Sequence, residues 1–100
     1  MFKAIILLTR KPELSHQEFV DWWWGEHAPL ASALPGVRRV CFNDVAAGEP
    51  VDGVSELWFD SEAEFLAAYE TEHGKSVAAN TLEHCSKRER MIVRENWVKE

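Results

Sequence analysis

The stretch FVDWWWGEHAPL, Phe19–Leu30, decides how the rest of this 100-residue chain can fold. Three consecutive tryptophans, a histidine and a proline lie on this one segment. Phe19, Trp23 and His27 recur every four residues, which predicts that they share the apolar face of a helix. Trp24 lies about 100° further round such a helix than Trp23. At least one tryptophan must therefore lie at a rim or an interface rather than in the core.

Both ends of this helix carry sequence signals. Ser15 and Glu18 form a capping box, in which each side chain binds a free backbone amide of the first turn. Pro29 has no amide to donate to the carbonyl of Gly25, and it disfavours helical geometry at the preceding residue. We expect the helix to end or kink at Pro29, just past His27.

The remaining elements alternate along the chain. Strands are predicted at residues 2–9, 37–45, 53–59 and 91–98, and helical segments at 62–72 and 75–85. Ser61 and Glu64 form a second capping box, and Gly74 is the expected C-terminal cap of that helix. This order predicts an α+β, ferredoxin-like βαββαβ fold with a four-stranded antiparallel sheet, formed by one domain over residues 1–100.

The predicted sheet has too many apolar residues for one face. Helices on a single face should leave strands that alternate apolar and polar residues, yet Ile5–Leu8 is apolar throughout. The last strand also has apolar residues on both faces. A second copy of the chain would cover the exposed face, so we expect a homodimer. The alternative is that these residues reflect strand propensity alone.

Composition limits the partners and the compartment. Hydrophobic residues are 46% and charged residues 28%, as in a globular domain. The net charge of −6 argues against nucleic acid or an anionic membrane as a partner, and Lys87–Arg90 reads as a short charged turn. Cys41 and Cys85 fit a reducing compartment. The apolar run Ala4–Leu8 is too short for a membrane span, so we expect a cytoplasmic protein.

Metal and cofactor motifs are absent from the sequence. The chain has no closely spaced histidine pair, no glycine-rich phosphate loop and no serine nucleophile elbow. We therefore expect neither a metal nor a cofactor.

His27 is the main candidate for a functional side chain. It is either a packed, hydrogen-bonded core residue or a pocket residue, because burial among indoles would favour the neutral imidazole, a usable general base or hydrogen-bond donor. Trp23, on the same face, is the candidate for stacking on a flat substrate, although large aromatic residues more often fill cores and interfaces.

Three polar residues in apolar strands are further candidates: Asn43, Glu56 and Glu95. A carboxylate that points into an apolar cavity has a raised pKa and could pair with His27 in proton transfer next to a carbonyl. Glu56 is the second catalytic candidate, and Asn43 and Glu95 are substrate-binding candidates. Alternatively, either carboxylate pairs with a strand arginine as a structural salt bridge, and Asn43 forms a strand-end turn.

The chain resembles the EthD-domain family of small dimeric α+β-barrel proteins. The resemblance rests on TRKP at residues 9–12, HAPL at 27–30, PGV at 35–37, Asn43, DGVSELWFDS at 52–61 and VRE at 93–95. It implies a ferredoxin-like subunit that pairs sheet to sheet, and a cavity between the sheet and the helices. Some members have a tyrosine in the second strand near the position of Val40, and the absence of this tyrosine here removes a possible hydroxyl partner for His27.

The resemblance implies cofactor-free chemistry on a small, mostly apolar carbonyl-containing or aromatic molecule: isomerisation, dehydration or oxygenation, with His27 as base or donor. Members of the family also include auxiliary proteins, so a non-catalytic protein that binds a small hydrophobic ligand is the second hypothesis. A purely structural dimer with a packed His27 is the third.

Overall fold

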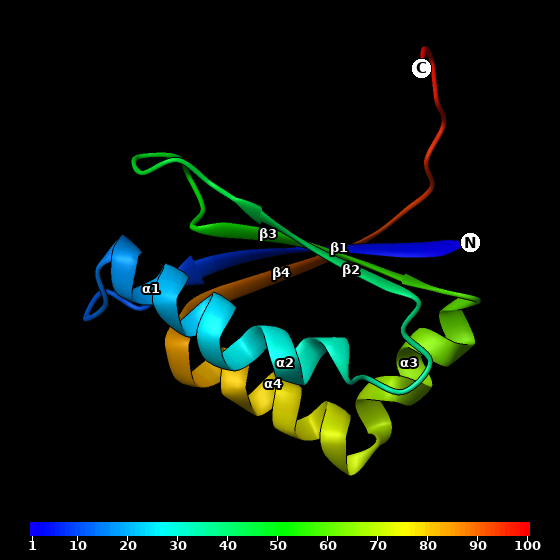
Figure 1. Cartoon of the computed structure of the whole chain (residues 1–100), viewed down its shortest axis with the longest axis horizontal. Helices are drawn as coiled ribbons and strands as arrows, with labels where there is room; N and C mark the ends of the chain where they lie inside the picture. Colours follow the sequence, from blue (N-terminus) through cyan, green and yellow to red (C-terminus); the bar gives the residue numbers. More distant parts are fainter.

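The computed structural model describes all residues from 1 to 100 and contains one antiparallel sheet with the strand order β2-β3-β1-β4 (Figure 1). The elements in chain order are β1 (Phe2–Arg10), α1 (His16–Trp22), η1 (Trp23–His27), α2 (Ala28–Ser32), β2 (Arg39–Asp44), β3 (Gly53–Phe59), α3 (Glu62–Glu70), α4 (Glu72–His84) and β4 (Cys85–Val93). This is the predicted ferredoxin-like arrangement.

The helices cover only one face of the sheet (Figure 1). Ala4, Ile6 and Leu8 of β1 are buried on that face and belong to the hydrophobic core. Ile5 and Leu7 are half-buried on the other face, called the outer face here, because successive side chains of a strand point to opposite sides. The apolar outer positions noted in the sequence are therefore present, and no helix covers them.

We expected the helix that begins at the Ser15–Glu18 capping box to end or kink at Pro29; it does not end there, and an irregular turn lies directly before Pro29. The capping box is formed as expected, but residues 23–27 make a π-helical turn, η1, in which the amide of Ala28 donates to the carbonyl of Trp23. The wider turn uses an i→i+5 bond, and Pro29 then lies in the first turn of α2, where its missing amide costs nothing.

Gly74 does not cap the first of the C-terminal helices. Thr71 ends α3 and starts α4 at once: its hydroxyl donates to the carbonyl of Ala68 (2.7 Å) and accepts from the amide of Gly74 (3.0 Å). Gly74 is a buried residue of the first turn of α4, and a Cβ there would lie 2.0 Å from the carbonyl oxygen of Ala68. The glycine thus permits close approach of the two helices.

The last strand lies earlier than predicted: β4 is Cys85–Val93, and residues 94–98 are not a strand. The charged run that read as a turn is therefore in the sheet. Arg88 and Arg90 point to the helix side, where their guanidinium groups lie 5.7 Å and 5.1 Å from the ring centroids of Tyr69 and Phe65. Long basic side chains cover apolar surface with their stems, which hides a strand from a hydropathy pattern.

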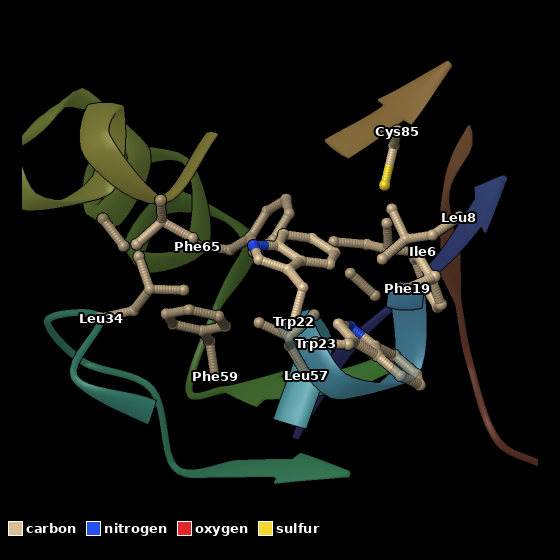
Figure 2. Close-up of a cluster of buried hydrophobic side chains, with 13 residues drawn as sticks. Ile6, Leu8, Phe19, Trp22, Trp23, Leu34, Leu57, Phe59, Phe65 and Cys85 are labelled. Carbon is tan, nitrogen blue, oxygen red and sulfur yellow. The ribbon is translucent and has the colours of Figure 1, made fainter. Parts of the chain in front are cut away.

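Aromatic rings from the helices and the sheet fill the core (Figure 2). Trp23 is fully buried and stacks on Phe42 of β2, with ring centroids 4.2 Å apart and planes 4° apart. A Cβ on Gly53 would lie 2.7 Å from the Trp23 indole, so this glycine makes room for the ring. None of the helices has the length and apolar character needed to cross a membrane.

Candidate functional site

The π turn places His27 against α4, where both of its ring nitrogens face polar side chains. The Nδ1 atom lies 3.0 Å from Oδ1 of Asn80, and Nε2 lies 3.4 Å from the hydroxyl of Thr81. Trp22 donates its indole N–H to the same Oδ1 of Asn80 over 3.0 Å. His27 is buried, and this burial lowers its pKa because the imidazolium would lose its hydration. The imidazole is therefore neutral near pH 7.

An open cavity of about 350 Å³ lies between β2, α2 and the first turn residues of η1. Its lining is Trp24, Ala28, Pro29, Ser32, Val40 and Phe42. His27 does not line it, but Phe42 does, and the Phe42 ring faces the His27 imidazole with centroids 6.3 Å apart and planes 19° apart. A mostly apolar, partly aromatic hollow of this size suits a small flat molecule.

Trp24 is the tryptophan at the rim. Half of its side-chain surface is exposed (50%), and its indole N–H donates to Oδ1 of Asp44 over 2.8 Å. The helical geometry of the sequence required one tryptophan at a rim, and Trp24 takes that position.

Trp23 lies behind the cavity, in the core. Its face is covered by Phe42, and its Nε1 is buried without a hydrogen-bond partner. In this conformation the ring offers no free face for stacking on a ligand.

The three polar candidates, Asn43 in β2, Glu56 in β3 and Glu95 just after β4, gather on the outer face of the sheet, the side opposite His27. Glu56 accepts from the ammonium group of Lys3 (2.6 Å) and from the amide of Asn43 (3.0 Å). Glu95 lies 3.4 Å from Lys3, and its other oxygen accepts from the indole of Trp58 over 3.4 Å. The sheet therefore brings these residues together with each other but not with His27.

The pKa of Glu56 moves opposite to our expectation. The hydrogen bonds from Asn43 and Lys3 favour the carboxylate and lower its pKa. The partner of Glu56 is Lys3 rather than an arginine, so the expected structural salt bridge forms with a different residue. In the single chain, Glu56 is an ionised, paired carboxylate and not a proton acceptor with a raised pKa.

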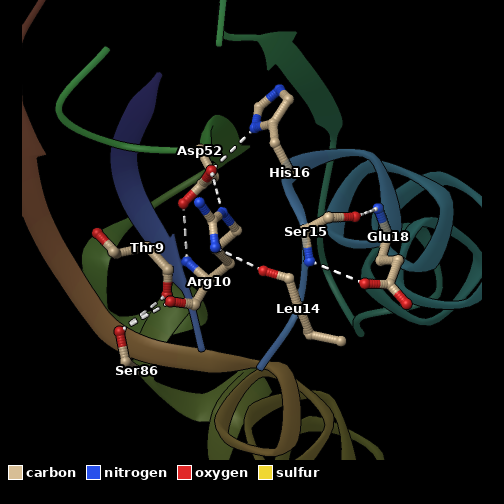
Figure 3. Close-up of polar contacts among 8 residues, drawn as sticks. All are labelled: Thr9, Arg10, Leu14, Ser15, His16, Glu18, Asp52 and Ser86. Atoms are coloured by element: carbon tan, nitrogen blue, oxygen red, sulfur yellow. Dashed lines mark hydrogen bonds and ion pairs between the residues drawn. The ribbon is translucent and has the colours of Figure 1, made fainter. Parts of the chain in front are cut away.

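A second polar cluster ties the N-terminus of α1 to the loop before β3 (Figure 3). Asp52 accepts from the backbone amide of Arg10 (2.9 Å) and from its Nε (3.2 Å), and it pairs with Nδ1 of His16 at 2.8 Å. These contacts lower the pKa of Asp52 in spite of its partial burial. Each charged group of the cluster has its partner within it, which fits a structural tie.

Metal and thiol chemistry find no support in the geometry. No group of three or more histidine, cysteine, aspartate or glutamate side chains could hold a metal ion. Burial raises the pKa of the Cys85 thiol to about 12, and Cys41 is exposed on the outer face.

Four residues of these clusters were not singled out from the sequence: Asn80 and Thr81 beside His27, Phe42 at the cavity, and Lys3 on the outer face. Asn80 and Thr81 sit in a helix of ordinary amphipathic pattern, and Phe42 reads as a strand residue. Their importance depends on which elements pack together, and a single sequence carries no signal for it.

Comparison with known proteins agrees with this fold. The EthD domain profile matches residues 11–84, which is more than half of the chain. A search of curated protein sequences gave no match. An ethyl tert-butyl ether D (EthD) family protein from Bacillus halodurans has 25% sequence identity and a TM-score of 0.80, over 96% of this chain and 100% of that chain.

Two more distant structures share the fold. A dimeric protein of unknown function and ferredoxin-like fold from Bacteroides fragilis has 13% identity and a TM-score of 0.74, over 94% of this chain and 95% of that chain. An antibiotic biosynthesis monooxygenase has 16% identity and a TM-score of 0.70, over 96% of this chain and 99% of that chain. With the profile match and the fold in agreement, the chain belongs to the EthD family.

Proposed function

We propose that the cavity between α2 and β2 binds a small, mostly apolar carbonyl-containing or aromatic molecule, on which His27 acts as an acid–base group. One observation carries the proposal: a hollow of about 350 Å³, walled by Trp24 and Phe42, borders the ring that faces a buried, neutral imidazole. The chemistry would be a cofactor-free isomerisation, dehydration or oxygenation.

Phe42 controls contact between a bound molecule and His27. Its ring lines the cavity on one side and stacks over Trp23 and His27 on the other. A ligand would reach the imidazole when Phe42 changes its rotamer, and the vacated space would leave Trp23 as a flat apolar surface. This is the way in which Trp23 could serve as the stacking residue.

Ligand binding can be tested with acetophenone, a small aromatic ketone, by NMR titration of the labelled protein. We expect chemical-shift changes at Trp24 and Phe42 that saturate with concentration. Ala28→Phe fills the cavity and should abolish them, whereas Ala63→Phe, at an exposed position of α3, should not. Equal binding to wild type and Ala28→Phe would place the ligand elsewhere.

The second candidate function is a non-catalytic binding or auxiliary protein, as the family resemblance allows. His27→Ala separates the two once a substrate has been found by screening carbonyl compounds. Loss of a general base lowers turnover by about 10²-fold or more while the ligand still binds. A folded variant with unchanged turnover would remove His27 from the chemistry, and changed affinity without any turnover in the wild type would favour the binding protein.

We also propose that the chain forms a homodimer through the outer face of the sheet. Ile5, Leu7, Val54 and Trp58 make this face apolar, and one structural relative is described as dimeric. Asn43, Glu56 and Glu95 would then belong to the interface, where their bonds to each other, Lys3 and Trp58 leave few polar groups unpaired. Light scattering at low micromolar concentration should give the mass of two chains.

A further inference from the structure

We infer that Asn80 is a positioning residue that holds His27 as the Nδ1–H tautomer and leaves the lone pair on Nε2, so that His27 acts as a base and not as a donor. The geometry of Trp22, Asn80 and His27 carries this inference. Its meaning for catalysis rests on the proposed function, but the tautomer itself can be measured without any ligand.

Trp22 fixes the orientation of the Asn80 amide. An indole N–H can only donate a hydrogen bond, so the atom 3.0 Å from Nε1 of Trp22 must be the acceptor of the amide, its oxygen. The assignment therefore does not depend on distinguishing oxygen from nitrogen in the side chain of Asn80. The amide oxygen faces the cluster because a tryptophan points at it.

The same oxygen then decides the state of His27. The Nδ1 atom lies 3.0 Å from this oxygen, and two acceptors cannot form a hydrogen bond, so Nδ1 must carry a proton. Burial lowers the pKa of His27 and so disfavours a second proton on the ring, and the positive charge of Arg88 acts in the same direction. A neutral imidazole protonated at Nδ1 has its lone pair on Nε2.

Thr81 leaves that lone pair available. Its hydroxyl lies 3.4 Å from Nε2 but 3.2 Å from the carbonyl of Val77, the residue four positions earlier in α4. The hydroxyl has a single proton, so the carbonyl of Val77 and the lone pair of Nε2 compete for it, and the contact with Nε2 is the longer of the two. A buried acceptor of this kind favours ligands that bring a proton with them.

The inference narrows the substrate class to molecules with an acidic C–H next to a carbonyl, or with a hydroxyl group. The Nε2 lone pair takes the substrate proton, the C–H electrons become those of an enolate, and the imidazolium keeps its Nδ1–H bond to Asn80. Return of the same proton to another atom completes an isomerisation without a co-reactant. A ligand with acceptors alone would find no donor on His27.

The test is the tautomer of His27, read from long-range ¹H–¹⁵N NMR spectra of the full chain with labelled histidine. The wild type should show a protonated Nδ1 and a lone-pair Nε2 at pH 7.5. Asn80→Leu, similar in size but without an acceptor, should lose this preference. Asn80→Asp keeps an acceptor and should retain it.

His84 provides an internal control in the same spectra. Its Nδ1 lies 3.0 Å from the backbone carbonyl of Asn80, a group that no side-chain substitution removes. His84 should therefore keep its own tautomer in both variants, which also reports that α4 remains folded. A protonated Nε2 on His27 in the wild type, or an unchanged tautomer in folded Asn80→Leu, overturns the inference.

Other results would contradict the proposed function and leave the role of Asn80 intact. If His27 is the Nδ1–H tautomer and yet acetophenone does not bind, or His27→Ala keeps full turnover on a substrate, the positioning by Asn80 stands and the assigned chemistry is wrong.

Discussion

At the scale of single residues, the burial of His27 makes stability depend on pH. Its pKa is lowered in the folded chain, mainly by burial, while the unfolded chain has the ordinary value of about 6.5. As the pH falls below that value, the unfolded state takes up the proton first, so the free energy of unfolding decreases. Above about pH 6.5, the burial of His27 does not lower the free energy of unfolding.

The measurement compares urea unfolding of the wild type and His27→Gln between pH 7.5 and pH 5. The wild type should lose more stability over this range than the variant, in which position 27 no longer titrates. Asp52 and Glu56 also have lowered pKa values, but their stabilisation is lost only below the ordinary carboxyl values of 3.8 and 4.5. Equal slopes for the two proteins would contradict the burial of a neutral imidazole.

The close packing of Gly53 against the Trp23 indole gives the second prediction at this scale. A Cβ there would lie 2.7–3.0 Å from three atoms of the Trp23 indole, whose movement is blocked by Phe42. Gly53→Ala should therefore destabilise the fold by about 1–3 kcal/mol through overpacking, as measured by urea unfolding.

Gly25→Ala is the matched control for that substitution. Nothing lies within 4 Å of the added methyl group at this helical position. Because alanine loses less conformational freedom than glycine on folding, the free energy of unfolding should rise by about 0.5–1 kcal/mol. If both substitutions destabilised equally, contact with Trp23 would not be the cause.

The sequence was informative about residues wherever a local pattern sufficed. The burial of His27 on the apolar face and the rim position of one tryptophan followed from helical spacing, and the Ser15–Glu18 capping box formed as predicted. Asn80 did not follow, because its partners are 53 and 58 positions away in sequence. The sign of the Glu56 pKa shift was wrong for the same reason: Lys3 comes from another strand.

At the scale of elements, the junction of α3 and α4 depends on Gly74. The added methyl group in Gly74→Ala would meet the backbone of Ala68 at 2.0 Å and of Tyr69 at 2.6 Å, and backbone atoms cannot turn away as a side chain can. We expect a loss of about 3 kcal/mol or more in the free energy of unfolding. Lys75→Ala, at the exposed neighbouring position, should change it by less than about 0.5 kcal/mol. A stable Gly74→Ala protein would mean that the helices can separate at this point.

Element order and most strand positions were predictable, whereas the end of α3, the bounds of β4 and the π turn before Pro29 were not. β3 was predicted with the bounds that the structure has, because Gly53 and Phe59 delimit a run of strand-forming residues. The start of β4 was missed because charged residues cover apolar surface with their stems. The π turn before Pro29 was not foreseen, although Pro29 indicated an irregularity there, because the turn depends on an i→i+5 bond that no residue pattern marks.

At the scale of the whole molecule, the outer face predicts how the chain assembles. Leu7→Glu places a charge at the centre of the apolar outer face and should convert the proposed dimer into a monomer in sedimentation analysis. Leu82→Glu is the control, since Leu82 is more exposed (64%) but belongs to α4, away from that face. A dimer that survives Leu7→Glu and dissociates with Leu82→Glu would place the interface on the helices.

The π turn at residues 23–27 also has a meaning for how this sequence can vary. An i→i+5 turn holds one residue more than an α-helical turn, so the segment behaves as a one-residue insertion into a continuous helix. Removing one residue, such as Gly25, would restore the α-helical spacing and leave Ala28 and Pro29 in place relative to α1. Pro29 would then follow a regular α-helical turn, where its missing amide leaves a carbonyl of that turn without a partner, so the shorter segment would favour another residue at this position.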